Sequence, residues 1–492
     1  MDGNLVLPIQ TFGCTIAFRG AMMFLDRTRE LGYLNDRYSA GRSEIVVLYG
    51  RRRVGKSALL FEWSEGRPCI FFFARRADKS TLLGEFSRAI RAVSTGGPAP
   101  DDFTYVSWGA AFGAIVELAA EQRLVVVLDE FPYLVEADPE LPTLLQREWD
   151  LRLQQTQLFL VLSGSIQSVI RPQVLDPTAP LYRRHTWPFE LKPLTLTDLP
   201  AFFPRYTAEQ LVETFAVLGG MPYYLVSVDP QLSLLANIKR HILAPQGSLF
   251  AEVRLQLHEE LRGDIEDSLA LLRAIAGGAH RRAEIARSSG LPVRTTDHRL
   301  AALVELGILE HRKAVERIRN ADRWGAYHLR DPFFRFWHQW VLPNEDYLAI
   351  GRRQEEVADQ IRQALPRIVA PIWEEVARHH LLAASADRII PFHFEEIGSW
   401  WSGDAQIDIV GVNRAERRVL FGEAKWTREP MTEAALEKLI DRGNRWLGGD
   451  TGWDVHYALY AREFGQVREA AGQEPGFYFF GPEDVVKTPD DT

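Results

Sequence analysis

Residues 45–57 join a short run of apolar, mostly β-branched residues to a glycine-containing turn, in the sequence IVVLYGRRRVGKS. The first five residues predict a buried parallel strand, and the run ALLFEW that follows the turn predicts a helix. The pattern G-x-x-x-x-G-K-S lies between them, and its glycines let backbone N–H groups curl around a phosphate. The sequence therefore predicts an α/β protein with a parallel sheet and a nucleotide-binding turn.

Each part of this turn has an expected role in holding a nucleoside triphosphate. The helix after it directs its positive N-terminal end at the phosphates. Lys56 is expected to reach the β- and γ-phosphates, and the Ser57 hydroxyl is expected to ligate Mg²⁺. The alternative is an ordinary glycine turn followed by an exposed lysine. The predicted nucleotide-binding residues are Gly50, Arg51, Arg52, Arg53, Val54, Gly55, Lys56, Ser57 and Ala58.

A second apolar run, residues 124–128, ends in the two acidic residues Asp129 and Glu130. The run predicts a central strand, and ligands of open α/β sheets bind where the strands end. We expect Asp129 to hold Mg²⁺ through water and Glu130 to polarise the water that attacks the nucleotide. The alternative is a strand that ends in a solvated acidic turn. The phosphate-binding turn predicted nearby argues against this alternative.

Composition limits the organisation of the chain and its environment. A chain of 492 residues is too long for one core, so roughly two to four domains are expected. The net charge of −9 argues against a uniformly basic nucleic-acid binder, so any basic surface must be local. Two cysteines, Cys14 and Cys69, are typical of a reducing compartment. Because we find neither a membrane-spanning apolar run nor a secretory signal, we expect a cytoplasmic protein.

The rest of the first domain is expected to alternate helices and strands. A helix from residue 24 to about residue 38, with Asp26 as its N-cap, precedes the phosphate-binding turn. Further strands are expected at residues 69–74 and 158–162, and helices at residues 82–93 and 103–121 with a loop at 94–102.

Several residues after the last of these strands are candidates for contact with the nucleotide. Ser163 or Ser165 could sense the γ-phosphate or belong to a plain turn. Arg183 or Arg184 could reach a phosphate in its own or a neighbouring subunit, although a surface arginine is the simpler interpretation. Residues 218–224 contain a helix break followed by proline, which either lines the nucleotide pocket or packs.

These motifs resemble those of the archaeal-type ATPases in the STAND group of P-loop NTPases. The matching pieces are FLDRTREL, LYGRRRVGKS, LVVVLDEFPYL, LVLSGS, PLYRR and GGMPYYL, in this order over roughly residues 20 to 250. The resemblance implies a RecA/AAA-like domain with a small helical lid, in which the first and last pieces flank the nucleotide. It also implies ATP with Mg²⁺ as the ligand, Ser163 or Ser165 as a sensor, and Arg183 or Arg184 as an arginine finger.

The pattern changes at about residue 263, where short helices are closed by glycines. We expect helices at residues 265–275, 281–288 and 293–306, with Gly307 as a C-cap, and strands at residues 308–313 and 325–329. Three helices and a two-stranded wing are typical of a winged helix-turn-helix.

The third of these helices carries the candidates for DNA contact. They could meet phosphates and base edges. Between residues 281 and 313 there are seven basic and four acidic residues, an excess too small to exclude a protein-interaction module or a rigid spacer. The candidates are Arg294, Thr295, Thr296, His298 and Arg299.

A second group of candidate catalytic residues lies in the last third of the chain. Strands are expected at residues 389–397, 406–412 and 419–426, with residues 398–403 as a loop between the first two. Glu423 and Lys425 share one face of their strand, and Asp408 can lie beside them on the preceding strand. Because apolar residues flank these charges, burial is costly unless they are paired or bind a metal. Two carboxylates and a lysine suit a Mg²⁺ site that cuts a phosphodiester, with the metal held by Asp408 and Glu423.

This region resembles the PD-(D/E)XK nuclease superfamily, in the subgroup fused to archaeal-type ATPases, over about residues 327 to 485. Asp408, Glu423 and Lys425 match its signature, and Glu374 in the sequence WEEV matches a glutamate on the preceding helix. The resemblance therefore implies catalytic roles for these four residues. Gln406 departs from the acidic residue that is common at its position, which puts a second metal in doubt.

The predicted domains are a P-loop ATPase core at residues 20–200, a helical lid at 201–262, the winged helix-turn-helix at 263–330 and an α/β, restriction-endonuclease-like domain at 331–485. The favoured function is ATP-dependent action on DNA with Mg²⁺-dependent cutting, in a protein that could form homo-oligomers. Two alternatives stay open. One is a regulatory NTPase whose C-terminal domain only binds nucleic acid or protein, and the other is an ATPase with a degenerate nuclease fold as a scaffold.

Overall fold

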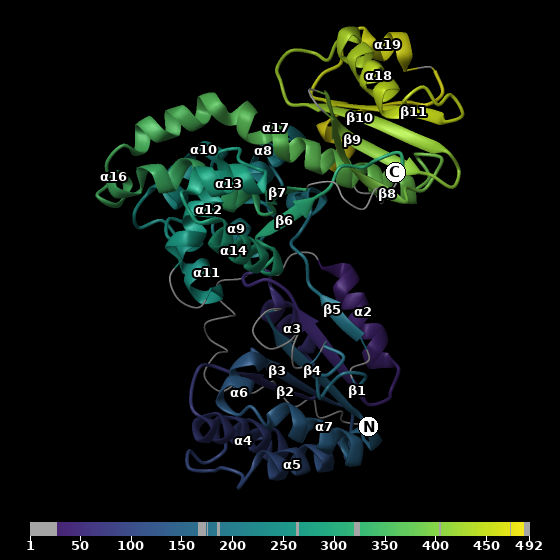
Figure 1. Ribbon diagram of the computed structural model, residues 1–492. Coiled ribbons are helices and arrows are strands. Elements are labelled where there is room, and N and C mark those ends of the chain that lie inside the picture. The colour runs from purple at the N-terminus through teal and green to yellow at the C-terminus, as the bar shows by residue number, and fades with distance from the viewer. Residues whose placement is uncertain are drawn as a thin grey trace. The chain divides into compact units, whose positions relative to one another are not determined.

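The computed structural model describes residues 27–165, 174, 176–184, 187–261, 265–318, 325–402, 405–472 and 474–486 (Figure 1). The chain forms two compact units. The first comprises Met1–Pro193 with Met221–Val226, and the second comprises Leu194–Gly220 with Ser227–Thr492. The predicted N-cap Asp26 lies outside the described residues. Within the described part of the chain, no helix is both long and apolar enough to cross a bilayer.

The first unit is built on a five-stranded, fully parallel sheet with the order β2-β3-β4-β1-β5. This confirms the predicted parallel α/β architecture. Strand β4 separates β1 from β3, so the turn after β1 and the acidic end of β3 lie on either side of the end of β4. The strands are β1 (Glu44–Tyr49), β2 (Cys69–Phe73), β3 (Leu124–Asp129), β4 (Leu158–Gly164) and β5 (Trp187–Glu190).

Helices cover both faces of this sheet. Alternate residues of β4 point to opposite faces, as the pleat of a strand requires. On one face, Phe159 packs against Trp63, with ring centroids 5.1 Å apart. The opposite face carries Leu160 and Leu162, which belong to the main core. The helices of this unit are α2 (Thr28–Ser39), α3 (Lys56–Ser64), α4 (Lys79–Thr95), α5 (Trp108–Glu121), α6 (Phe131–Ala137), α7 (Leu141–Leu151) and α9 (Pro222–Val226), with a short 3₁₀ turn at Leu153–Gln155.

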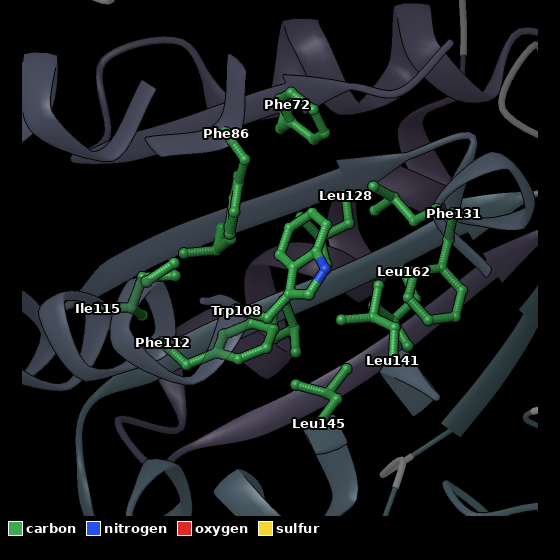
Figure 2. Packing of buried hydrophobic residues seen from close by; sticks show 14 of the residues in the cluster. Phe72, Phe86, Trp108, Phe112, Ile115, Leu128, Phe131, Leu141, Leu145 and Leu162 are labelled. Carbon is green, nitrogen blue, oxygen red and sulfur yellow. The ribbon is translucent and has the colours of Figure 1, made fainter. Parts of the chain in front are cut away.

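The main core of the first unit lies between the sheet and helices α4 to α7 and includes several packed aromatic rings (Figure 2). The ring of Phe86 lies 5.2 Å from that of Phe72, 5.7 Å from that of Trp108 and 6.3 Å from that of Phe112. Burial of such large side chains contributes about 2 kcal/mol each relative to exposure. The core therefore fixes the strands whose ends carry the functional residues.

Three helix starts in the first unit differ from the sequence prediction. Helix α2 begins at Thr28, later than expected. Caps and tertiary contacts decide the other two starts, those of α4 and α5. Helix α4 begins earlier than expected, since the Asp78 carboxylate accepts hydrogen bonds from the first-turn N–H groups. Helix α5 begins only at Trp108, so the expected start at residue 103 is wrong. The Ser107 side chain caps α5, and the N–H of Tyr105 donates to Ser87 Oγ on the neighbouring helix at 3.0 Å.

The second unit begins with helices and continues into a three-helix group with a small hairpin. Strands β6 (Leu309–Arg312) and β7 (Ala326–Leu329) pair antiparallel. The helices predicted between residues 265 and 306 are confirmed to within one residue. Helices before the hairpin are α8 (Ala208–Leu218), α10 (Leu234–Asn237), α11 (Glu252–Glu260), α12 (Glu266–Ala276), α13 (Arg282–Ser289) and α14 (Val293–Glu305), with short 3₁₀ or π segments at Leu196–Ala201 and Ile238–Leu243.

Exposure differs among the residues of helix α14 that we expected to contact DNA. Thr296 is fully buried, so its assignment as a DNA-contacting residue is wrong. The helical period places Thr296 on the same face as the buried Leu300 and Leu303. Arg294 and His298 are exposed on the other side of the helix. Gly307 adopts φ +64°, as expected of a residue that closes a helix.

A mixed five-stranded sheet forms the C-terminal part of the second unit, with the order β12-β11-β10-β9-β8. Figure 1 labels four of its strands, β8 to β11. Strands β8, β9 and β10 pair antiparallel, and β10, β11 and β12 pair parallel. The strands are β8 (Glu396–Ser402), β9 (Ala405–Asn413), β10 (Arg418–Lys425), β11 (Asp454–Ala461) and β12 (Phe477–Phe480). Helices are α15 (Pro332–Phe336), α16 (Glu345–Ala349), α17 (Gln354–Ala386), α18 (Glu433–Leu447), α19 (Val467–Ala471) and α20 (Pro482–Val486), with 3₁₀ or π segments at Trp337–Val341 and Leu342–Asn344.

Two expectations for this sheet are wrong. The strand predicted at residues 389–397 begins only at Glu396, and the predicted loop at 398–403 is mostly strand, with an irregular register between Gly398 and Trp400. A bulge of this kind breaks the alternating pattern on which the prediction relied. Helix α20 ends at Val486, and residues 487–492 lie outside the described part.

Candidate functional site

The phosphate-binding turn connects the end of β1 to the start of α3 with the curled backbone that the sequence predicts. Gly55 (φ +94°) and Arg53 (φ +68°) adopt left-handed conformations. Gly50 has no room for a side chain, because a Cβ atom there would lie 2.4 Å from the carbonyl oxygen of Leu191. This approach follows from the pairing of β5 beside β1, in which Leu191 donates its N–H to the Tyr49 carbonyl at 2.7 Å. Tertiary packing therefore explains the glycine at position 50.

The Lys56 ammonium group is buried at the mouth of this turn. Its Nζ donates to the carbonyl oxygens of Gly50 at 3.0 Å and Arg51 at 3.1 Å. A lysine held over the turn that leads into the N-terminus of α3 suits a phosphate, since its charge and the backbone N–H groups act on the same anion. Ser57 and Ala58 lie in the first turn of α3.

Asp129 and Ser163 bring two buried oxygen atoms without hydrogen-bond partners to the sheet edge beside this turn. Asp129 Oδ1 accepts from the N–H of Glu130 at 3.1 Å, whereas Asp129 Oδ2 has no partner. Ser163 Oγ also has none. Ser163 pairs with Leu48 of β1, and the adjacent pairing of Leu128 with Leu162 brings it level with Asp129. Because unpaired buried oxygens are costly, these residues fit a hydrated Mg²⁺ and a phosphate.

Glu130 follows directly and adopts a left-handed backbone conformation with φ +51°. This conformation costs a non-glycine residue on the order of 1 kcal/mol and is found more often at functional sites than elsewhere. Glu130 precedes α6, and its carbonyl accepts from the N–H of Tyr133 at 2.9 Å. The carboxylate is half-buried next to Asp129, which suits the predicted role of directing water.

Two aromatic residues that the sequence did not single out hold the arginines of the turn. Arg52 Nη2 donates to the hydroxyl of Tyr133 at 2.9 Å. The Arg53 guanidinium lies 4.2 Å from the ring centroid of Tyr223 in α9, a cation–π contact. Segment 218–224, expected either to line the pocket or to pack, therefore contacts the phosphate-binding turn through α9.

Arg27 is a further residue that the sequence analysis missed. It is buried, with φ +74°, at the start of α2. Its Nη2 donates to the Val54 carbonyl at 3.1 Å, and its Nη1 donates to Glu30 Oε1 at 2.9 Å. The motif FLDRTREL contains Arg27 but does not show which of its residues reaches the turn.

The two arginine-finger candidates have different surroundings. Arg184 lies against Asp150 of α7, with Nε–Oδ1 and Nη2–Oδ2 distances of 3.2 and 3.0 Å. Arg183 is exposed, with φ +65°, and its guanidinium lies 5.8 Å from the ring centroid of Tyr182. Ser165 is buried just beyond β4. The finger and sensor roles stay predictions.

The second group of candidate catalytic residues, Asp408, Glu423 and Lys425, lies where β9 and β10 pair. The Ala424 N–H donates to Asp408 Oδ2 at 3.1 Å, so Asp408 lies beside Glu423 as expected from the hairpin. Lys425 Nζ lies 3.6 Å from Glu423 Oε1, which agrees with the predicted shared face. The neighbour of Glu374, Trp373, packs on Trp426 with ring centroids 5.1 Å apart and holds α17 against the end of β10.

Burial and mutual repulsion shift the acid equilibria of these carboxyl groups. Burial, together with the negative charges of Asp408 and Glu423, raises the pKa of Glu374 to about 8. Burial and the charge of Glu423 raise the pKa of Asp408 to about 7. Carboxyl groups that repel one another in this way are a common feature of sites that accept a cation.

The carboxylates of this second group of residues, in the positions that they occupy, do not form a complete metal site. Among the described residues, no group of three acidic, histidine or cysteine side chains is arranged to hold an ion. Sequence reasoning also missed Arg442 of α18, whose Nη1 lies 2.9 Å from Glu423 Oε2. The carboxylates thus supply suitable oxygen ligands, but a cation of the chain already faces one of them.

Stability should depend on pH through Glu374. Its carboxyl group keeps a proton in the folded state up to about pH 8, whereas the unfolded chain releases it near pH 4.5. Without divalent cations, the free energy of unfolding should therefore fall as the pH rises through this window. Chemical denaturation at several pH values should show a flatter profile for Glu374→Gln. The exposed Glu355→Gln on the same helix should keep the wild-type slope, and equal slopes for all three proteins would contradict the assignment.

Comparisons with known proteins agree with the first site. The sequence profile of a family described as an ATPase domain predominantly from Archaea matches residues 24–228. A profile described as archaeal and bacterial proteins of unknown function matches residues 337–439. The Walker-type ATPase of Pyrococcus abyssi has a similar structure, with a TM-score of 0.50 and 20% identity, covering 64% of this chain and 96% of that chain.

Two curated proteins of Methanocaldococcus jannaschii are related in sequence. An uncharacterized protein is 30% identical over 444 residues, which cover 90% of this chain and 96% of that protein. An uncharacterized ATP-binding protein is 38% identical over 48 residues, covering 10% of this chain and 81% of that protein.

Fold, site and comparisons together define an ATP-binding, Walker-type P-loop ATPase. The relationship to the first M. jannaschii protein extends over nearly the whole of both chains. The chain belongs to the family of archaeal-type P-loop ATPases that carry this C-terminal domain of unknown function.

Proposed function

We propose that this protein hydrolyses ATP with Mg²⁺ and uses a C-terminal, metal-dependent site to cut DNA. The observation that supports the second activity is the placement of Asp408, Glu423 and Lys425 on two paired strands, with Glu374 coupled to them electrostatically. Two carboxylates and a lysine at one strand end supply oxygen ligands and a positive charge, as phosphodiester hydrolysis requires.

At the first site, the residues of the turn position the triphosphate for attack by water. Backbone N–H groups of the turn and Lys56 hold the β- and γ-phosphates. Bound Mg²⁺ neutralises charge on these phosphates, and Ser57 and Asp129 are the residues that would hold it. Glu130 orients a water molecule whose oxygen bonds to the γ-phosphorus while the bond to the β–γ bridging oxygen breaks.

At the second site, Asp408 and Glu423 would hold the metal, and Glu374 lies within their electrostatic reach. A divalent ion bound there would supply a water of lowered pKa and would neutralise charge at phosphorus. Lys425, with an exposed side-chain fraction of 38%, can face the substrate from the same strand end. Its ammonium group stabilises negative charge that develops on the phosphate oxygens.

Nicking of supercoiled DNA tests this site. With Mn²⁺ or Mg²⁺, the wild-type protein should convert the plasmid to its open-circular form, and Lys425→Ala should lower the rate by about 100-fold. Lys239→Ala, which removes a surface lysine that pairs with Glu355, should cut like the wild type. If the wild type and Lys425→Ala are equally inert with every cation tested, the proposed nuclease activity is wrong.

DNA contact is proposed for the exposed side of α14 in the predicted winged helix-turn-helix. Several basic residues of this region are already paired, since Arg282 binds Asp297 and Arg299 lies near Asp267. Arg294 is exposed. In gel shifts at several salt concentrations, Arg294→Ala should reduce the salt dependence of binding by about one phosphate contact. Arg362→Ala on α17, which removes an exposed arginine paired with Asp359, should leave it unchanged.

A regulatory ATPase with a non-cutting C-terminal domain is the second candidate. The observation that favours it is the ion pair between Arg442 and Glu423, together with the absence of a converging ligand set among the described residues. In that case the C-terminal domain binds nucleic acid or protein, and ATP turnover proceeds without nicking.

A further inference from the structure

Both oxygen atoms of the Glu423 carboxylate face a positive charge from the chain itself. Arg442 Nη1 lies 2.9 Å from Oε2, and Lys425 Nζ lies 3.6 Å from Oε1. The Glu423 side chain is only 9% exposed, and that of Arg442 is 30% exposed. A charge-assisted hydrogen bond in such surroundings is stronger than a surface ion pair.

The fold places Arg442 there through its neighbour Gly443. A Cβ atom at Gly443 would lie 2.8 Å from Phe421 Cδ2 in β10, so the glycine lets α18 lie close to the strand. Trp446, one turn further along the helix, packs on Phe421 with ring centroids 5.5 Å apart. The position of the Arg442 guanidinium is therefore set by packing between α18 and β10.

The same helix borders a shallow, open hollow of about 400 Å³ whose lining includes Arg442. Arg445 also borders it and pairs with Asp441 of the same helix at 3.5 Å. The residues that line the hollow are Ala405, Glu437, Lys438, Asp441, Arg442 and Arg445. Three of these six side chains are cationic and two, Glu437 and Asp441, are acidic, so the lining has a net charge of +1 (3 − 2), which suits a phosphate group better than a metal ion.

We infer that Arg442 is a built-in counter-ion of Glu423 that keeps divalent metal out until a phosphodiester backbone enters the hollow and draws the guanidinium away. This inference rests on the proposed metal site at Asp408 and Glu423. Metal and guanidinium compete for one carboxylate, because a cation at Oε2 repels a second cation there. A phosphate in the hollow offers Arg442 a bidentate partner in place of Glu423.

Metal binding without nucleotide tests this competition directly. Titration calorimetry with MnCl₂ should show that Arg442→Met binds Mn²⁺ at least about tenfold more tightly than the wild type, since the competing ion pair is gone. Arg442→Gln should behave in the same way. Arg445→Met removes a cation one turn away that pairs with Asp441 instead, and it should match the wild type. Adding Glu423→Gln to Arg442→Met should abolish the gain.

The second arm adds a short DNA duplex of arbitrary sequence. The duplex should raise the Mn²⁺ affinity of the wild type towards that of Arg442→Met and leave the variant unchanged. If the wild type binds Mn²⁺ through Glu423 but Arg442→Met binds it no more tightly, the inference is overturned while the metal site stands. If neither protein binds Mn²⁺, both the inference about Arg442 and the proposed metal site are wrong. If DNA leaves the Mn²⁺ affinity of the wild type unchanged, a phosphodiester does not draw Arg442 away from Glu423, and that part of the inference is wrong.

Discussion

Lys56→Ala should reduce ATP affinity by at least about 100-fold, because it removes a buried cation from the mouth of the phosphate-binding turn. Isothermal titration calorimetry with ATP and Mg²⁺ measures the loss. The fold should survive, since the hydrogen bonds that the charged Lys56 donates to the carbonyls of Gly50 and Arg51 are worth about 2 kcal/mol each.

The matched control is Lys79→Ala, which removes a lysine of the same unit that pairs with Asp138 at 2.8 Å. This variant should bind ATP like the wild type. Undiminished ATP binding by Lys56→Ala, in a protein that melts like the wild type, would contradict the nucleotide site. Weaker binding by both variants would point to a general loss of stability instead.

Glu130→Gln should lower the rate of ATP hydrolysis by about 100-fold or more and leave ATP binding nearly intact. The amide keeps the size of the side chain but removes the negative charge that polarises water. It also keeps the left-handed backbone conformation (φ +51°) without a larger side chain. Phosphate release under single-turnover conditions, compared with calorimetric ATP binding, separates chemistry from binding.

Glu136→Gln on α6, the helix that directly follows Glu130, serves as the control. Glu136 is 44% exposed and lies 3.6 Å from Arg76, so its loss should not affect turnover. If Glu130→Gln hydrolyses ATP at the wild-type rate, the water-directing role belongs to another residue.

Local patterns in the sequence were sufficient to locate the first site. The apolar run before Gly50 and the run before Asp129 predicted β1 and β3, because a continuous run of buried residues marks a central strand. The turn sequence itself specifies the curled backbone around Lys56. The same reasoning failed at β8, where the bulge near Trp400 interrupts the alternation of inward and outward side chains. It also failed at Thr296, which was expected to contact DNA but is fully buried.

The partners of these residues were not visible in the sequence. Arg27 reaches Val54 across 27 positions. Tyr223 meets Arg53 from a segment that follows much later in the chain. Arg442 reaches Glu423 only because Gly443 allows α18 to pack closely on β10. Each contact joins residues whose proximity depends on how elements pack.

The sequence alone determined the class of the first domain and its phosphate-binding turn, and it supplied the acidic residues that are proposed for both sites. These features are local, since a few adjacent residues specify a strand, a turn or a helix start. The tertiary structure decided that β4 brings Ser163 between the turn and Asp129, and that Glu423 faces Arg442. Such facts depend on burial and on pairing between distant segments, which no stretch of neighbouring residues encodes by itself.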